Sequence, residues 1–408
     1  MSLKQNKFNC VQMDSSHPKW KNCISRIDKI YHRDDDIRTD FYRDYTRVLH
    51  SQPYSRLKHK TQVFFATQND HICTRMEHVH HVASVSYTIA KNLGLNTELT
   101  QAIALSHDIG HAPFGHEGET RLKEISKSVL KENFWHEKNG LYVVDNIATV
   151  QNIDNIHKNF NLTYAVRDGI ICHCGEINEN GIHPRENAID LNDIDSPNQY
   201  SPYTWEACVV KISDKIAYLG RDIQDALELG IMSKVGLLGL KNIISKYSDS
   251  KVLNNTVLIH KLIIDLCENS TPEKGICLSK TCCELIDEVK QFNYEHIYTH
   301  PNVQAYKEYS GLIIKSIYDF LIRYYNKYDD VLNSKQIIKK YPLLIPTFID
   351  WLIKYSSVDT FKKRRMRFGN HIIYNIEDKR DYQKAIIDFI AGMTDNFALK
   401  VYNEIIRF

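Results

Sequence analysis

The sequence predicts a mainly α-helical protein with at most a small β element. Apolar residues recur at steps of three and four along most of the chain, and strand-like runs are few and short. Several periodic segments begin after a capping side chain or end at a glycine. A length of 408 residues is large for one core, so we expect one large helical domain with an appended helical region, or two domains.

Two neighbouring helices are expected in the first part of the chain. Apolar residues keep a helical spacing from Val79 to Leu93, and Gly94 follows as a candidate C-cap. Thr97 is the expected N-cap of the next helix, which runs through "ELTQAIALSHDIG". The same spacing predicts three long helices further along: Tyr203–Gly230, Asn302–Tyr328 and Asp381–Phe408.

Three segments depart from the helical pattern. Gln62–Ala66 has the composition of a short strand, and Glu176–Ser201 is rich in Asn, Asp, Pro and Gly, which predicts a loop. A long loop of this kind is either functional or a surface insertion. The basic run "KKRRMR", Lys362–Arg367, is either a solvated face or a set of cations that reaches phosphate groups in this or a neighbouring subunit.

The composition is ordinary for a globular protein. Hydrophobic residues make up 43% and charged residues 25%, and the net charge of +2 does not demand a nucleic-acid or membrane partner. We expect no membrane span, because no run of about 18 apolar residues is present. We expect no secretory signal, because the start "MSLKQNKFNC" lacks an apolar h-region. Ten scattered cysteines in a long chain predict reduced thiols and a cytoplasmic location. Cys172–Cys174 and Cys282–Cys283 lack a paired CxxC spacing, so we do not expect them to bind zinc.

The stretch "SHDIGHAPFGHEGE" concentrates histidines and carboxylates between two predicted helices. Side by side on a regular helix, His107 and Asp108 would project about 100° apart. Gly110 and Pro113 permit a local bend that lets both side chains reach one metal ion. A mixed set of imidazole and carboxylate ligands suits Mn²⁺, Fe²⁺ or Zn²⁺, and Mg²⁺ less well.

A mononuclear site needs further ligands from other parts of the chain. His78 lies on the preceding predicted helix and Asp214 on the long helix that follows. Ligands drawn from three helices suit a site inside a helical bundle. By residue type alone, His80 and His81 stay open as alternatives to His78.

Three motifs resemble the HD-domain superfamily, in which the metal ligands follow the order His, His-Asp, Asp: "TRMEH", "ALSHDIGHAPFGHEGE" and "SDKIAYLGRDIQDAL". More narrowly, they resemble its deoxyguanosinetriphosphate triphosphohydrolase-like branch of dNTP triphosphohydrolases. The resemblance continues, in order, through four further segments: Arg43–Phe65, Phe134–Val144, Asp168–Glu176 and Asp388–Tyr402. It implies an HD-domain helical bundle, with an N-terminal arm at 1–45, a catalytic core at 46–230 and a helical C-terminal region at 231–408 that packs on the core.

The resemblance implies one divalent metal ion with four ligands: His78, His107, Asp108 and Asp214. His78 is preferred over His80 and His81 because it keeps the family spacing after Arg75. The ion is expected to be Mn, Mg, Fe or Zn, with Mn or Mg supporting activity. Two carboxylates bring a dipositive ion close to neutrality, and open coordination positions then accept a water molecule and a phosphate oxygen.

The family reaction is hydrolysis of a dNTP at the α-phosphate to a deoxynucleoside and inorganic triphosphate. The sugar 5′-oxygen is a poor leaving group, so a histidine that binds no metal is needed for proton transfer. The resemblance assigns this role to His116 with Glu119, which share one helix face if a helix restarts just before them. It also places His111 and His136 at the phosphate or the reaction centre, although His136 is alternatively a surface residue near Glu137.

The resemblance further implies a set of substrate-binding side chains: Arg75, Gln62, Arg56, Lys215, Tyr218 and Asp222. Arginine and lysine side chains suit phosphate. Tyr218 would exclude a 2′-hydroxyl by its bulk, or is a plain core residue, while Asp222 and Gln62 would bond the 3′-hydroxyl. Tyr218 and Asp222 follow Asp214 at i+4 and i+8, so one helix face presents all three.

Two other functions fit parts of this pattern. Another HD-domain phosphohydrolase, acting on a nucleoside monophosphate, a cyclic nucleotide or an alarmone, would share the metal ligands but would not need Gln62, Tyr218 and Asp222. A nucleotide or nucleic-acid sensor without catalysis would not need His116 and Glu119. The partners that the resemblance implies are the dNTP substrate, further copies of the chain in a homo-oligomer, and a dNTP or single-stranded DNA as an effector.

Overall fold

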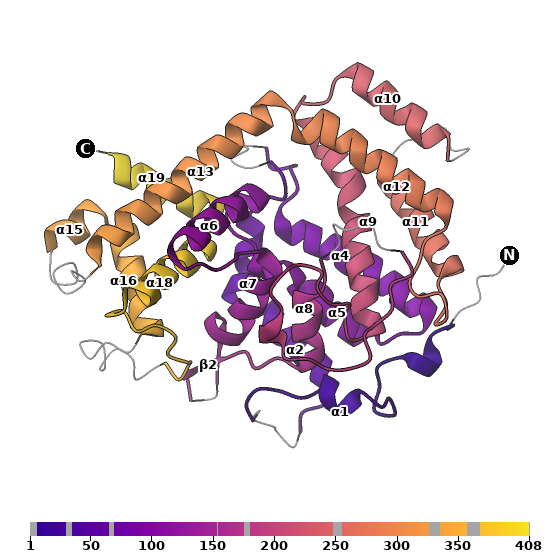
Figure 1. Cartoon of the computed structure of the whole chain (residues 1–408), viewed down its shortest axis with the longest axis horizontal. Coiled ribbons are helices and arrows are strands. Elements are labelled where there is room, and N and C mark those ends of the chain that lie inside the picture. The colour runs from indigo at the N-terminus through magenta and orange to yellow at the C-terminus, as the bar shows by residue number, and fades with distance from the viewer. Residues whose placement is uncertain are drawn as a thin grey trace. The chain divides into compact units, whose positions relative to one another are not determined.

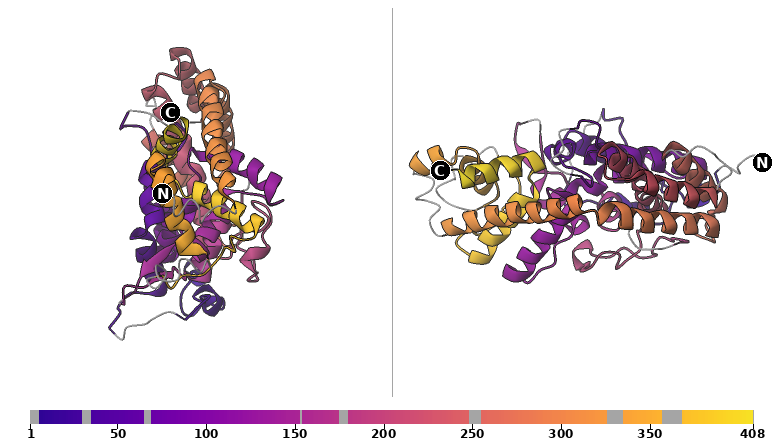
Figure 2. Two further views of the ribbon diagram at one scale, coloured as in Figure 1. Left: turned by 90° about the vertical axis from the view of Figure 1, so that its left-hand side faces the viewer. Right: turned by 90° about the horizontal axis from the view of Figure 1, so that it is seen from above.

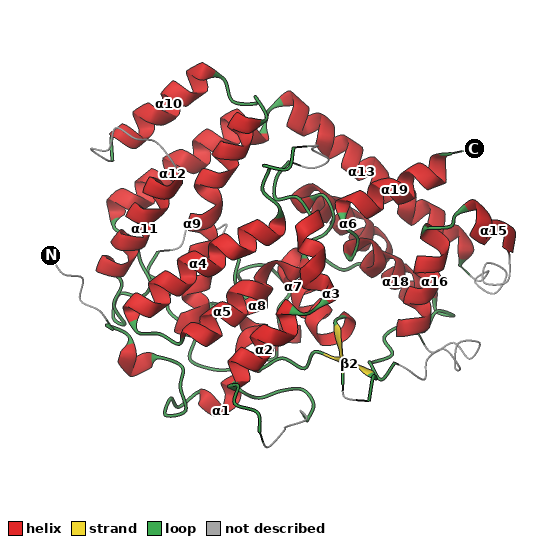
Figure 3. Ribbon diagram, turned by 180° about the vertical axis from the view of Figure 1, so that it is seen from behind, coloured by secondary structure: helices red, strands yellow, loops and turns green. Residues whose placement is uncertain are grey.

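The computed structural model describes residues 6–29, 35–64, 69–152, 154–174, 180–247, 255–325, 335–356 and 368–407. Within these ranges the protein is mainly helical, with one small two-stranded sheet (Figures 1 and 3). The predicted fold class is therefore confirmed. None of the helices in these ranges combines the length and hydropathy that crossing a membrane requires. The basic run Lys362–Arg367 lies outside the described residues.

The chain folds into two compact units, each built from three separate stretches of sequence. Unit 1 consists of Met1–Leu49, Thr67–Asp108 and Leu162–Ala305. Unit 2 consists of His50–Ala66, Ile109–Asn161 and Tyr306–Phe408. One boundary falls directly after Asp108, inside the segment with the clustered histidines. The expected division into an arm, a catalytic core and a C-terminal region stays a prediction.

Unit 1 is helical, and its α-helices are α1 (Trp20–Cys23), α2 (Asp40–Leu49), α4 (Arg75–Leu93), α5 (Thr97–Ser106), α8 (Tyr164–Ile171), α9 (Trp205–Glu228), α10 (Lys234–Ser245), α11 (Asn255–Asn269) and α12 (Lys280–Asn293). The long helix α9 packs against α4, α5, α11 and α12 (Figure 1). Helix α4 also packs along α5, which in turn packs against α2. Most side chains of α9 are buried, whereas Asp214 in its middle stays partly exposed, with 19% of its side chain accessible.

Unit 2 contains the helices α3 (Gln52–Arg56), α6 (Gly115–Val129), α7 (His136–Tyr142), α15 (Lys335–Lys340), α16 (Leu344–Tyr355), α18 (Lys379–Ala391) and α19 (Asp395–Ile406), and most of α13 (Pro301–Leu321). Strands β1 (Thr149–Gln151) and β2 (His157–Asn159) pair antiparallel. A single apolar core joins α6, α13, α16, α18 and α19. In Figure 2 the yellow α18 and α19 lie beside the orange α13, and the Tyr382 hydroxyl of α18 donates to the carbonyl of Leu321 at 3.2 Å.

The helix that carries His78 begins at Arg75, ahead of the predicted periodic segment, and ends before the C-cap Gly94 as predicted. Thr74 and Glu77 form a reciprocal capping box at the start of α4, and Gly94 ends the helix in the left-handed conformation at φ 82°. The predicted N-cap Thr97 is wrong by one residue. Asn96 is the cap of α5, because its side chain accepts hydrogen bonds from the backbone N–H groups of Glu98 and Leu99.

The other long helices are shorter than predicted. Helix α9 begins after the capping residue Thr204 and ends two residues before Gly230, and α13 passes into a 3₁₀ turn at Ile322–Tyr324. The single helix predicted over Asp381–Phe408 is wrong, because the chain forms α18 and α19 instead. Thr394 separates them, since its side chain caps α19 by accepting from the N–H of Phe397.

The predicted β element is in a different place. No strand forms at Gln62–Phe64, and the last two residues of the predicted strand lie outside the described residues. The hairpin β1–β2 takes its place, and its strands of three residues are too short to show an alternating pattern. The predicted loop at Glu176–Ser201 is confirmed over residues 180–201, where the only helical element is the 3₁₀ turn Leu191–Asp193.

Candidate active site

The four predicted metal ligands all belong to unit 1 and come from three packed helices. His78 lies in the first turn of α4, Asp214 lies in the middle of α9, and His107 and Asp108 follow α5 directly. After Ser106 the chain tightens from α-helix into the 3₁₀ turn His107–Gly110. The predicted bend is therefore present, and it begins at the His-Asp pair itself.

The ligand atoms of this cluster lie close together. His78 Nε2 is 2.9 Å from Asp214 Oδ1, and His107 Nε2 is 3.9 Å from the same oxygen. The ligand atoms of His78, His107 and Asp214 all lie within 4.8 Å of one another. Asp108 Oδ1 is 3.6 Å from His107 Nε2. These distances bring all four predicted ligands to one place in unit 1.

His107 shows why this cluster fits a metal ion. Its ring is fully buried, and its Nδ1 lies 2.7 Å from the carbonyl of Ala104, which accepts the Nδ1–H. That bond leaves a lone pair on Nε2, and Nε2 is buried with no hydrogen-bond partner among the described residues. A buried polar atom without a partner costs about 1–3 kcal/mol. A ligating histidine that donates its other N–H to a carbonyl is the usual arrangement at a metal site.

The charges of the cluster favour the deprotonated form of Asp214. Burial raises the pKa of Asp214, but the hydrogen bond and charge of His78, together with the charge of His107, lower it to about 2. Burial lowers the pKa of His78, and its bond to Asp214 outweighs this effect and raises the pKa above the ordinary value. An ionised Asp214 is the form of this side chain that binds a divalent cation.

The alternative ligands are less well placed. His80 is exposed and His81 is half-buried, whereas His78 is buried in the cluster. All ten cysteines are free thiols, and none belongs to a group of candidate ligands in the described part of the chain. The geometry thus favours His78 and gives no support to a cysteine site.

Arg75 lies within the same cluster. Its side chain is buried, and its Nη1 donates to Asp108 Oδ2 at 2.9 Å. The guanidinium therefore holds one of the predicted metal ligands in place and brings a positive charge to the site. Lys215, next to Asp214 on α9, is also buried. Burial raises the pKa of the Cys283 thiol, and the positive charge of Lys215 acts on that thiol and opposes the rise.

Helix α9 carries a second polar group two turns beyond Asp214. The Tyr298 hydroxyl donates to Asp222 Oδ2 at 2.5 Å, while Asp222 Oδ1 is buried without a hydrogen-bond partner among the described residues. Burial, partly opposed by the bond from Tyr298, raises the pKa of Asp222 to about 6. Tyr218 is half-buried on the same helix. One carboxylate oxygen on this helix is therefore in position to accept a hydrogen bond from a ligand.

The predicted proton-transfer residues lie together in unit 2. Helix α6 begins at Gly115, as predicted, and places His116 and Glu119 one turn apart. His136, the first residue of α7, donates its backbone N–H to Glu119 Oε1 at 3.1 Å, and its Nδ1 lies 3.0 Å from Oε2. The rings of His111 and His136 stack with their centroids 3.9 Å apart. The sequence prediction named all four members of this cluster.

Glu119 is the centre of the cluster. Burial alone would raise the pKa of its carboxyl group, but the charge of His136 and the hydrogen bonds of His116 and His136 hold it well below the ordinary value. His116 Nδ1 lies 3.5 Å from Glu119 Oε2, and the His116 side chain is 58% exposed. An exposed imidazole beside an ionised carboxylate is suited to carrying a proton.

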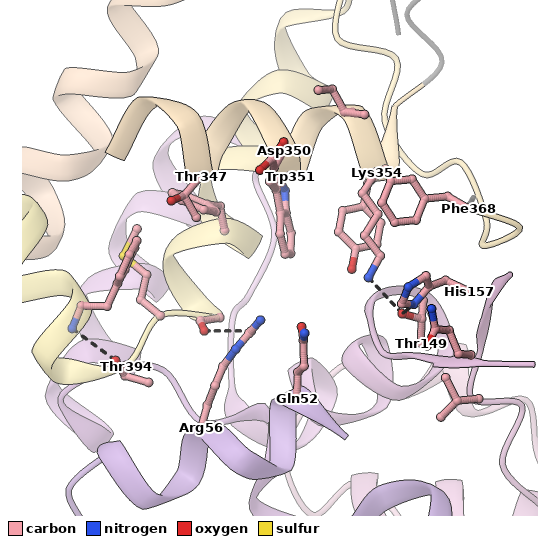
Figure 4. Close-up of a pocket in the computed structure, with 18 of the residues that line it drawn as sticks. Gln52, Arg56, Thr149, His157, Thr347, Asp350, Trp351, Lys354, Phe368 and Thr394 are labelled. Carbon is pink, nitrogen blue, oxygen red and sulfur yellow. Dashed lines mark hydrogen bonds between the residues drawn. The ribbon is translucent and has the colours of Figure 1, made fainter. Parts of the chain in front are cut away.

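Gln62 and Arg56 lie in unit 2. The guanidinium of Arg56 donates to the carbonyl of Gly392 at 3.0 Å and faces a cavity of about 950 Å³. In Figure 4 Arg56 points toward Trp351 on α16, and Lys354 reaches from the same helix to Thr149. Gln62 is half-buried. Of the predicted substrate contacts, Arg56 is the one that lines this cavity.

Two residues beside the predicted ones were not predicted from the sequence. His173 is buried in unit 1 with its ring 5.0 Å from that of His107, and its Nδ1 lies 2.6 Å from the carbonyl of Ile170. It stands in Asp168–Glu176, a segment that resembles the family but in which no single residue was assigned a role. Tyr298, the partner of Asp222, lies in the part of the chain where the motifs are weak, and no sequence signal marks it.

Comparison with protein families matches residues 75–219 to the HD domain and residues 359–404 to the phosphohydrolase-associated domain. A deoxyguanosinetriphosphate triphosphohydrolase-like protein of Caldanaerobacter subterraneus subsp. tengcongensis is 32% identical over 91% of this chain and 86% of its own length. The chain belongs to this family of HD-domain proteins. Proteins with the same description from Clostridium tetani and Desulfatibacillum aliphaticivorans are 28% and 31% identical and cover 99% and 90% of the chain.

Family membership confirms the resemblance that the motifs indicated. The protein is an HD-domain phosphohydrolase, and the HD match includes the four candidate metal ligands of unit 1 and the histidine–glutamate cluster of unit 2. The phosphohydrolase-associated match covers α18 and most of α19. The roles of individual residues stay predictions.

Proposed function

We propose that this protein hydrolyses deoxynucleoside triphosphates to a deoxynucleoside and inorganic triphosphate. In this reaction the oxygen of a water molecule bonds to the α-phosphorus, and the bond from that phosphorus to the sugar 5′-oxygen breaks. The family, the metal-ligand cluster of unit 1 and the histidine–glutamate cluster of unit 2 all support the proposal.

The observation that carries the proposal is the polar face of α9. This helix presents the ligand Asp214 and, two turns later, the carboxylate of Asp222, which has one oxygen bonded by Tyr298 and the other buried without a partner among the described residues. In our proposal that oxygen accepts a hydrogen bond from the sugar 3′-hydroxyl. The ring of Tyr218, between them on the helix, packs where a 2′-hydroxyl would stand and so favours deoxyribose.

The proposed cofactor is one divalent ion, Mn²⁺ or Mg²⁺, with His78, His107, Asp108 and Asp214 as ligands. When bound there, the ion would polarise a phosphate oxygen and lower the pKa of a water molecule. Arg75 and Lys215 would contribute positive charge toward the anionic triphosphate. Arg75 also keeps Asp108 oriented through its 2.9 Å bond.

In the proposal His116 gives a proton to the departing 5′-oxygen. Glu119, which stays ionised, lies beside the ring of His116 and orients it. His136 in turn fixes both oxygens of Glu119. His111, stacked on His136, contacts the phosphate.

Product analysis with each of the four dNTPs and GTP, in the presence of Mn²⁺ or Mg²⁺, tests the proposal. We expect a deoxynucleoside and triphosphate in equal amounts from at least one dNTP, and no turnover of GTP. Release of pyrophosphate or orthophosphate would contradict it. Hydrolysis that requires His116 but survives Tyr218→Ala and Gln62→Ala would favour a different HD-domain phosphohydrolase.

We extend the proposal to assembly and regulation on the basis of the family resemblance. The chain forms a homo-oligomer, and a dNTP or single-stranded DNA acts as an effector. Light scattering after gel filtration measures the mass, and assays with pairs of dNTPs or with an oligonucleotide measure activation. A monomer whose rate depends on the substrate alone would contradict this extension.

A further inference from the structure

The turn between His111 and His116 is held at both ends by buried charged side chains of unit 2. Lys60 donates from Nζ to the backbone carbonyl of His111 and, at 3.1 Å, to the last carbonyl of α18. Beyond it, the N–H of Phe114 donates to Asp395 Oδ1 at 2.8 Å. The start and the end of the turn are therefore both tied to the connection between α18 and α19.

Asp395 also holds the segment that precedes Gln62. Its Oδ2 accepts from the backbone N–H of Thr61 at 3.0 Å and from the Thr61 hydroxyl at 2.7 Å. The residue is only 3% exposed. Burial raises the pKa of Asp395, whereas the bonds from Phe114 and Thr61 favour the ionised form. A single buried carboxylate thus joins two segments that carry predicted active-site residues.

Phe114 depends on this carboxylate more than an ordinary residue would. Its φ of 65° lies in the left-handed region, which is unfavourable for a residue with a side chain. It occupies the N-cap position of α6 without any side-chain capping bond, and its ring is buried in the apolar core. If Asp395 did not accept the Phe114 N–H, that donor would be buried without its bond and the turn would relax.

The conformation of this turn sets the two histidines relative to each other. His111 precedes the turn and His116 follows it on α6, and their ring centroids lie 5.4 Å apart. A backbone rotation at Phe114 would move the one ring away from the other. Proton transfer depends steeply on such placement, because an error of about 1 Å reduces a rate about a hundredfold.

We propose that Asp395 is a positioning residue for catalysis, which acts through the backbone of Phe114 and Thr61 to place His116, His111 and Gln62. The inference rests on the proposed function. It assigns a task to the phosphohydrolase-associated segment, residues 359–404, which contains Asp395.

The test compares Asp395→Asn with Asp381→Asn in the full-length, metal-loaded protein. In Asp395→Asn an amide N–H group faces one of the backbone donors, so one hydrogen bond is lost. Asp381 is a matched control, because it is also an acid in the first turn of a C-terminal helix and also accepts a backbone bond, from Asn375 at 2.8 Å. Thr61→Val is a milder third variant that removes only the hydroxyl bond to Asp395.

Each variant is assayed with a dNTP and with its analogue that has sulfur in place of the bridging 5′-oxygen. The thiolate departs without a proton, so the analogue does not need the proton donor. We expect Asp395→Asn to lower kcat for the dNTP by about 30- to 100-fold and for the sulfur analogue by less than about fivefold. Thr61→Val should also lower kcat more for the dNTP than for the sulfur analogue, but by a smaller factor. Asp381→Asn should keep both rates within about twofold of the wild type.

Two results would overturn the inference. One is a dNTP rate within about threefold of the wild type in a folded, metal-loaded Asp395→Asn protein. The other is an equal loss with both substrates, which would show a general effect on the fold. His116→Ala serves as the reference. If the wild type releases no triphosphate, or if His116→Ala shows no contrast between the substrates, the proposed function itself is wrong.

Discussion

Single residues mark the places where the fold leaves polar atoms without partners. His107 Nε2 and Asp222 Oδ1 are both buried in unit 1 and have no hydrogen-bond partner among the described residues. Because such atoms are costly in a protein interior, each one points to a ligand atom that completes it. In the proposed function, the first would bind the metal ion and the second would accept a hydrogen bond from a hydroxyl group of the substrate.

The metal assignment predicts a sharp difference between two histidines on α4. His78→Ala should lose the bound metal and all hydrolysis, because it removes a buried ligand. His80→Ala should bind metal and turn over substrate within about twofold of the wild type, since the side chain is exposed. Metal analysis of the purified proteins and a rate assay check both. Metal loss in His80→Ala with retention in His78→Ala would reverse the assignment.

The raised pKa of Asp222 predicts that the free energy of unfolding depends on pH. Its pKa rises from 3.8 to about 6 in the folded protein, so the stability it contributes is fully present below pH 3.8 and is lost as the pH rises through 6. Asp222→Asn should therefore unfold less readily than the wild type at pH 7.5, by about 1–3 kcal/mol, with a smaller difference at pH 4.5. Denaturant titrations at both pH values measure this. A difference of equal size at both values would contradict it.

Residue types were predictable from the sequence, but the partners of those residues were not. The placement of His116 and Glu119 on one helix turn followed from their i, i+3 spacing and the expected restart of a helix just before them. Tyr298 and Asp395 were not found, because each reaches its partner from a part of the chain far away in sequence. A contact of this kind depends on the fold and leaves no local pattern.

At the scale of elements, helix boundaries were predictable where local capping decides them. Gly94 ends α4 as expected, because the left-handed conformation suits glycine. The break between α18 and α19 was missed, since apolar spacing continues across it and Thr394 has the cap role only once α19 packs. The β1–β2 hairpin was missed because three-residue strands carry too little pattern.

The segment between α5 and α7 contains Gly110, a glycine that we expect cannot be replaced by a larger residue. A Cβ atom on Gly110 would lie 2.2 Å from both the N of Gly140 and the carbonyl oxygen of His136, which are backbone atoms that cannot move aside easily. Gly110→Ala should cost about 3 kcal/mol or more of unfolding free energy. Thermal or chemical unfolding of the purified variant measures the loss.

Gly239→Ala on α10 is the matched control for this collision. The nearest atom to an added Cβ is 3.7 Å away, on the ring of Phe292. Alanine favours a helix over glycine, so this variant should gain up to about 1 kcal/mol. If both glycine variants lost the same stability, the collision at Gly110 would not be the cause.

At the scale of the whole molecule, family and fold class were predictable, whereas the pattern of the two units was not. The sequence motifs indicated the same family to which comparison over most of the chain assigns the protein. Each unit, however, draws on three separated stretches of the chain. Such interleaving depends on contacts between distant segments, and local periodicity does not encode it.

Metal binding should stabilise the folded protein. A metal ion that binds the folded state alone, at a hundredfold excess over its Kd, adds about 2.7 kcal/mol. The gain should shrink as the pH falls, because protons compete for His78, whose pKa is raised in the folded chain. Differential scanning calorimetry with Mn²⁺ and with chelator, at pH 8 and pH 6, measures the two gains. A gain that is larger at pH 6, or that persists in His78→Ala, would contradict the site.

The central claim is that water attacks the α-phosphorus and the 5′-oxygen leaves with the deoxynucleoside. Hydrolysis of a dNTP in ¹⁸O-water, followed by mass spectrometry of both products, tests this bond directly. We predict one ¹⁸O atom in the inorganic triphosphate and none in the deoxynucleoside. Label in the deoxynucleoside, or label in released pyrophosphate or orthophosphate, would contradict the claim.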